Sequence, residues 1–81
     1  MQLTERKIHI KNSTLNTLII ELKEECQNVL SLINQLEISE LSDRQKGKIL
    51  SELLVSSIYL DSHCNKDFQD LISDELETLQ D

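Results

Sequence analysis

Seven apolar residues in the first half of this chain recur with spacings that alternate between four and three. They are Leu15, Ile19, Leu22, Cys26, Val29, Ile33 and Leu36. This spacing keeps one stripe of a helix turned toward a neighbouring helix along its whole length. We call this stripe the seam. It predicts a chain that folds by burying helix faces against one another.

The composition argues against a β-rich fold. The 81 residues include no proline, one glycine, one tyrosine and one phenylalanine, whereas sheets and their turns use these residue types often. Leu, Glu, Lys and Gln are abundant and favour helix. We therefore expect an all-α fold in a single domain. A domain this small buries little surface, so oligomerisation is expected to add stability.

The first helix is predicted over residues 13–38, after a basic leader at residues 1–12. Residues 12–14 all carry side-chain oxygens that can cap a helix N-terminus. Within the leader, residues 7–11 alternate between polar and apolar types, as an extended segment does. The leader is therefore an extended segment, a flexible tail, or an arm that docks on the helices.

A turn is predicted at residues 38–42 because Ser42 and Gln45 match a capping box. A second helix should then run over residues 43–80. Residues 61–65 are mediocre helix formers, and Asn65 could cap a separate last helix.

The apolar periodicity favours one long second helix, with a kink or a break near residues 61–65 left open. Leu50, Leu53 and Leu54 are followed 18 residues later by Phe68, Leu71 and Ile72. Eighteen residues make about five helical turns, so an unbroken helix would carry both groups on one face.

Together the two helices predict an antiparallel helical hairpin that pairs with a second copy into a dimeric bundle. The core and oligomer seam should consist of the seam residues with Leu50, Leu53 and Leu54. The far end of the second helix would extend past the first helix and offer a candidate partner face. Its residues are Phe68, Leu71, Ile72, Leu76 and Leu79.

The net charge of −7 is concentrated near the C-terminus. Residues 49–81 carry one lysine against eight carboxylates, whereas the leader carries Arg6, Lys7 and Lys11 against one glutamate. An acidic surface repels nucleic acid and anionic membranes. It suits solubility or a basic protein partner.

The only cluster that could carry chemistry is Asp61, His63, Cys64 and Asp67. A zinc site needs about four converging ligands, and His63 and Cys64 diverge by about 100° on a helix. We therefore expect no metal, no cofactor and no enzymatic activity. His63 is expected on the surface and Cys64 in the core.

Cys26 and Cys64 both lie on apolar stripes, so buried thiols are expected at both positions. In a hairpin they would be offset by about 13 Å along the helix axes, too far for a disulfide. The chain has neither a signal-peptide pattern nor an apolar run long enough to span a membrane. We expect a cytoplasmic protein with reduced thiols.

Two functions fit these features. The first is a dimeric protein–protein interaction module, such as an adaptor, an inhibitor or an immunity-type regulator. The alternative is a small RNA- or DNA-binding regulator of the dimeric helical-hairpin type, whose leader would supply the phosphate contacts. Three basic side chains supply little affinity for nucleic acid, so the interaction module is the favoured hypothesis.

Overall fold

The computed structural model describes residues 7–79, which form three α-helices and no strand. Helix α1 spans Ser13–Leu36, α2 spans Asp43–His63 and α3 spans Lys66–Thr78. The all-α prediction is confirmed. The prediction of one long second helix is wrong, because α2 and α3 are separate helices.

Helices α1 and α2 begin at side-chain caps. The Leu15 amide donates to Asn12 Oδ1 at 3.0 Å. At α2, the Gln45 amide donates to Ser42 Oγ at 3.1 Å, and the Ser42 amide donates to Gln45 Oε1 at 2.8 Å. Both caps agree with the sequence, because each motif satisfies backbone donors that a helix start leaves without partners. Between the helices the chain reverses through Glu40, whose φ is +67°.

The break between α2 and α3 lies at Cys64 and Asn65. Asn65 has extended backbone, and its Oδ1 accepts from the Phe68 amide at 2.9 Å. Asparagine caps a helix better than it continues one, and its neighbours are weak helix formers. The break frees Phe68 to turn inward, where it is buried. Burial of this ring and a satisfied cap outweigh the continuous periodicity that favoured an unbroken helix.

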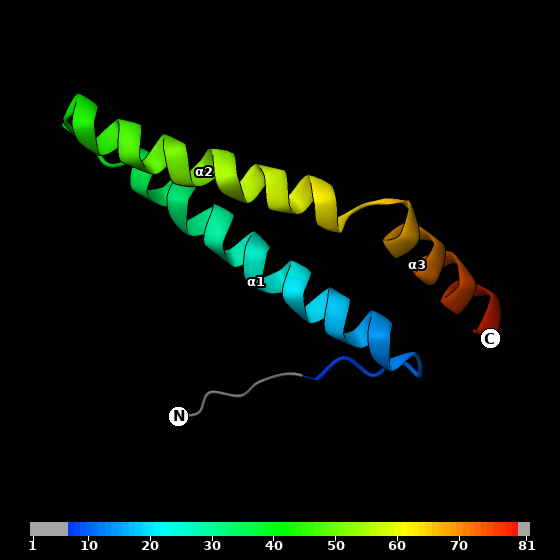
Figure 1. Ribbon diagram of the computed structural model, residues 1–81. Coiled ribbons are helices and arrows are strands. Elements are labelled where there is room, and N and C mark those ends of the chain that lie inside the picture. The colour runs from blue at the N-terminus through cyan, green and yellow to red at the C-terminus, as the bar shows by residue number, and fades with distance from the viewer. Residues whose placement is uncertain (1–6, 80–81) are drawn as a thin grey trace.

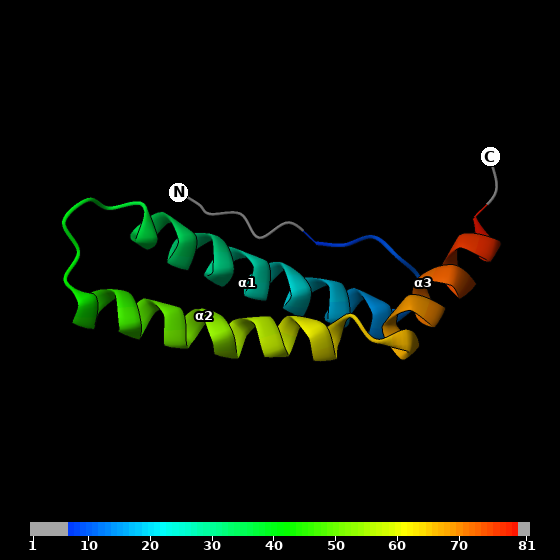
Figure 2. The ribbon, with the colours of Figure 1, turned by 90° about the horizontal axis from the view of Figure 1, so that it is seen from above.

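Helices α1 and α2 lie side by side and run in opposite directions (Figures 1 and 2). Helix α3 turns away at the end of α2 and contacts α1. Residues 7–12 pass beside α1 (Figure 2), where the Asn16 side-chain amide donates to the Ile10 carbonyl at 2.7 Å. Ile8 and Ile10 are half-buried, whereas Lys7, His9 and Lys11 are exposed.

The core of the described chain is small. Its buried apolar side chains are Leu15, Leu32, Ile49 and Phe68. They come from all three helices, but Leu15 and Leu32 lie about 25 Å apart along α1, so the buried residues are spread along the helix pair. The Cα trace measures 52 × 36 × 19 Å, and its radius of gyration is 16.7 Å, against about 12 Å for a compact chain of this length. Much of each helix therefore remains exposed.

Candidate interaction surface

The face of α2 that meets α1 differs from the predicted one. Ile49 and Ser56 are buried and Leu53 is half-buried, whereas Leu50 and Leu54 are exposed. The inner positions follow a spacing of four and three from Ile49. They are Ile49, Leu53, Ser56, Leu60 and His63. This repeat can be found in the sequence. The prediction missed it because two members of the repeat are polar, whereas Leu50, Leu53 and Leu54 form a more apolar cluster.

Those two polar residues join the helices by hydrogen bonds. Asn28 Nδ2 donates to Ser56 Oγ at 2.7 Å. His63 Nε2 lies 2.7 Å from the Leu18 carbonyl oxygen, so this nitrogen carries the proton and donates. The His63 ring also packs against Phe68, with centroids 4.9 Å apart and planes tilted by 60°.

The predictions for His63 and the cysteines are therefore wrong. His63 is half-buried, and Cys26 and Cys64 are both exposed free thiols. Cys64 is exposed because it lies at the C-cap of α2, past the last position that faces α1. Cys26 is exposed because α1 turns that edge of the seam away from α2. Asp61, another member of the cluster weighed for chemistry, is also exposed.

The seam on α1 is only partly covered by α2. Leu15 is buried, and Ile19, Leu22, Val29 and Leu36 are half-buried, but Cys26 and Ile33 are exposed. Leu32, the residue before Ile33, is buried in its place. A straight helix drifts by about 20° per seven residues against a strict heptad repeat. Consequently, one edge of the seam, which includes Cys26 and Ile33, is not covered by α2.

The two sides of the helix pair differ in chemistry. Around the axis of α1, Asn28 lies about 40° from Leu32 in one direction, and Ile33 lies about 100° from Leu32 in the other direction. On α2, Glu52 and Leu53 likewise lie on opposite sides of Ser56. Asn28 and Glu52 line one groove. The residues on the other flank of each helix therefore share the opposite side.

We call that opposite side the apolar side face. It consists of Ile19, Leu22, Cys26, Leu30, Ile33, Leu50, Leu53 and Leu54. Five of these are exposed: Cys26, and Leu30, Ile33, Leu50 and Leu54, whose exposed fractions are 59%, 41%, 53% and 62%. None of the eight is charged. The predicted core and oligomer seam had ten residues, and seven of them lie on this face without being buried: Ile19, Leu22, Cys26, Ile33, Leu50, Leu53 and Leu54.

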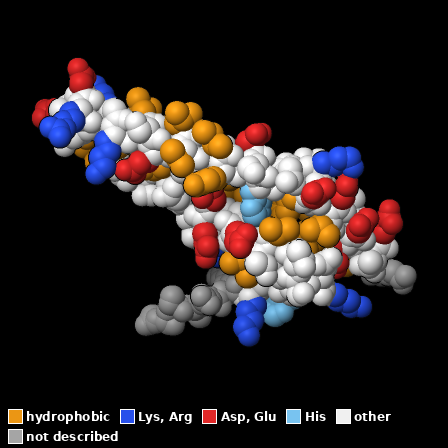
Figure 3. Space-filling view, in the orientation of Figure 1, with side chains coloured by type: hydrophobic (Ala, Val, Ile, Leu, Met, Phe, Trp, Pro, Cys, Tyr) orange, Lys and Arg blue, Asp and Glu red, His pale blue; other side chains and the backbone are white. Residues whose placement is uncertain are grey.

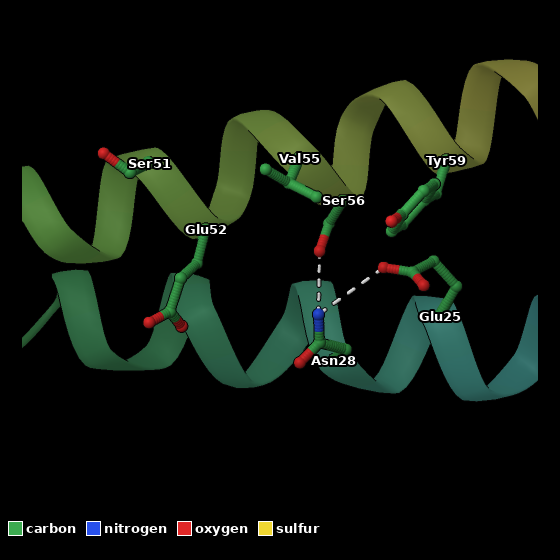
Figure 4. Close-up of a pocket in the computed structure, with 7 residues that line it drawn as sticks. All are labelled: Glu25, Asn28, Ser51, Glu52, Val55, Ser56 and Tyr59. Atoms are coloured by element: carbon green, nitrogen blue, oxygen red, sulfur yellow. Dashed lines mark hydrogen bonds between the residues drawn. The ribbon is translucent and has the colours of Figure 1, made fainter.

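The groove on the other side is open and of mixed chemistry, with Val55 and Tyr59 beside its carboxylates and hydroxyls (Figure 4). It has a volume of about 390 Å³ and is lined by Glu25, Asn28, Ser51, Glu52, Val55, Ser56 and Tyr59. The Ser56 hydroxyl accepts a hydrogen bond from Asn28, and the lining includes no histidine, lysine or cysteine that could activate it. A second hollow of about 400 Å³ lies near the turn and includes Ile38, Leu41 and Lys48.

The remaining predicted site residues are dispersed. Phe68 is buried inside the chain and is not available to a partner, and Leu71 is half-buried. Ile72 and Leu76 on α3 are exposed, as is Leu79 at its C-cap. The space-filling view shows acidic side chains around α3 and hydrophobic side chains along α2 (Figure 3).

The basic leader is described only in part. Lys7 and Lys11 are exposed, and Arg6 lies outside the described residues. Within residues 7–79, the structure holds no group of three His, Cys, Asp or Glu side chains that could bind a metal ion. None of the helices in that range is both long and apolar enough to cross a membrane.

Comparisons with models of protein families, with curated proteins and with solved structures find no match to this chain.

Proposed function

We propose that this chain is a protein–protein interaction module of the adaptor, inhibitor or immunity-type class, and that it acts through helix faces as a homodimer. The observation that carries the proposal is the apolar side face. Contiguous exposed apolar surface of this kind is typical of interaction sites in soluble proteins. In the proposed assembly, α1 and α2 act as a helical hairpin, and two hairpins form a bundle.

The polar features of the surface support binding rather than catalysis. The open groove has carboxylates and hydroxyls, but no hydroxyl of its lining is hydrogen-bonded to a carboxylate, and Ser56 accepts from Asn28 instead. The nucleic-acid alternative depends on the leader, where only Lys7 and Lys11 are exposed basic residues within the described chain. Two such charges contribute little to phosphate binding, and the acidic remainder opposes it.

A matched pair of isoleucines on α1 provides the test. Ile33 on the apolar side face has an exposed fraction of 41%, and Ile20, on a different flank, has 40%. We expect affinity capture from a native lysate, after nuclease treatment, to recover a defined polypeptide with the wild-type chain and with Ile20→Asp. Ile33→Asp should lose that polypeptide, because a buried unpaired carboxylate is costly.

Two results would contradict the interaction module. One is capture that the Ile33 and Ile20 variants support equally. The other is recovery of nucleic acid that disappears when Lys7 and Lys11 are replaced by alanine. Circular dichroism of each variant verifies that the helices persist.

A further inference from the structure

We infer that the occupant of the apolar side face is a second copy of this chain, with Cys26 inside the contact and Cys64 outside it. This inference rests on the proposed function and specifies its partner. Three properties of the described residues support it: the amount of surface, the distribution of charge and the continuity of the seam.

The exposed surface is large enough for such a contact. The chain has an accessible surface of 6709 Å², against about 5,000 Å² for a compact monomer of its mass. A standard interface removes about 800 Å² from each partner. The excess over a compact monomer is about twice that area. The chain could therefore bury one face in a standard interface and still expose more surface than a compact monomer does.

The distribution of charge permits two acidic chains to meet at this face. Each chain carries a net charge of −7, so any self-contact that includes carboxylates would bring like charges together. The eight residues of the apolar side face include none, although Asp61 borders them, about 20° from Leu54 around the axis of α2. Glu25 and Glu52 lie in the groove on the opposite side. Pairing through the apolar face therefore leaves these carboxylates in water.

The seam indicates that the partner on the apolar side face is a helix with the same heptad repeat. Cys26 and Ile33 occupy heptad positions, yet α2 does not cover them. Heptad positions pack best into the spaces between side chains of another helix with the same repeat. The same surface patch on a second chain supplies that repeat, because a two-fold interface uses one patch on both partners.

The two cysteines provide an internal control for this contact. Both thiols are free and exposed in the isolated chain. Cys26 lies on the apolar side face, and Cys64 lies at the C-cap of α2. Brief alkylation with N-ethylmaleimide across a dilution series, followed by peptide mass spectrometry, measures both rates on one molecule. Light scattering on the same samples gives the fraction of dimer.

We expect the alkylation rate of Cys26 to fall as dimer forms, while that of Cys64 stays constant. When nine-tenths of the chains are dimeric, Cys26 should react about tenfold more slowly, because only the monomer exposes it. Ile33→Asp and Leu30→Asp should abolish both the protection and the dimer. Ile20→Asp should retain both. Leu30 is mostly exposed in the single chain, so its substitution leaves the monomer folded.

Two outcomes would overturn the inference, and neither can be confused with failure of the proposed function. A chain that remains monomeric at every concentration has no second copy at this face. A dimer in which Cys26 and Cys64 react alike pairs through another surface. In both cases the dimer through this face is refuted, whereas a heterologous polypeptide whose capture depends on Ile33 but not on Ile20 would still support the interaction-module part of the proposed function.

Discussion

The imidazole of His63 contacts both helices that do not contain it. Its Nε2 donates to the Leu18 carbonyl of α1, and its ring packs on Phe68 of α3. The contact fixes the end of α2 against the start of α1 and supports the only buried aromatic ring in residues 7–79. One half-buried side chain therefore stabilises the packing of three helices.

We expect His63→Ala to lower the free energy of unfolding by about 2 kcal/mol. A lost hydrogen bond accounts for about 1 kcal/mol, and a lost aromatic contact for a similar amount. His9→Ala is the control, because His9 is exposed in the leader and its loss should change stability by less than about 0.5 kcal/mol. Urea unfolding measures both. Equal effects of the two substitutions would contradict the role assigned to His63.

Gly47 supports a second prediction at this scale. A methyl group added at Gly47 would meet no atom within 4 Å, and the residue lies inside α2. Gly47→Ala should raise the free energy of unfolding by up to about 1 kcal/mol, because glycine loses more backbone entropy in a helix than alanine does. Thermal unfolding by circular dichroism measures the change. A decrease in stability would indicate that Gly47 permits a close contact with another chain.

The residues that were hardest to place from sequence are the polar ones at helix contacts. Ser56 and His63 occupy positions in the α2 repeat, but hydrophobicity alone assigns them to the surface. Their burial depends on partners 28 and 45 residues away in the chain. A pattern of local spacing carries no information on such partners. The caps at Asn12 and Ser42 were predictable because donor and acceptor lie within three residues.

At the scale of elements, the break between α2 and α3 was a competition between two local signals. Continuous apolar periodicity favoured one helix, and the capping potential of Asn65 favoured two. The helix breaks at the cap because the bend lets Phe68 become buried. This burial involves residues from another helix, and apolar periodicity within one segment carries no information on it. The side face of α1 has a similar origin, because the seam alone does not say which edge α2 covers.

The cap of α3 can be tested without altering the core. Asn65→Ala removes the acceptor of the Phe68 amide and should reduce stability by about 1 kcal/mol. The loss should be concentrated in α3, whose 13 residues form too short a helix to persist without packing or caps. Hydrogen exchange should show faster exchange in residues 66–78 than in α1.

Asn65→Asp is the matched control for this cap. Aspartate caps a helix about as well as asparagine, and its charge suits the N-terminus of α3. It should therefore retain wild-type exchange rates. Faster exchange in both variants would show that the amide nitrogen of Asn65, rather than its oxygen, maintains the break.

At the scale of the whole molecule, the described chain resembles part of a bundle rather than a finished one. Helices α1 and α2 cover one flank of each other, and α3 covers the end of the pair (Figure 1). Helical domains normally enclose their apolar stripes between packed layers. The apolar side face has no second layer within residues 7–79. The groove on the other side carries Glu25 and Glu52, which stay in water, together with the exposed side chains of Val55 and Tyr59.

This separation of charge from apolar surface predicts how association depends on salt. Two chains of net charge −7 repel each other at long range, and salt screens that repulsion over about 10 Å at 0.1 M. The eight residues of the apolar side face contribute no ion pairs that salt could weaken, and Asp61 at their border adds to the repulsion. Raising the salt concentration should therefore strengthen the dimer, by less than about tenfold in Kd, because the repelling carboxylates stay outside the contact. Sedimentation equilibrium at low and high salt measures the change, with Ile20→Asp as a variant that should follow the wild type. Association that weakens as salt increases would instead require attractive charge pairs across the interface, which the apolar side face cannot supply.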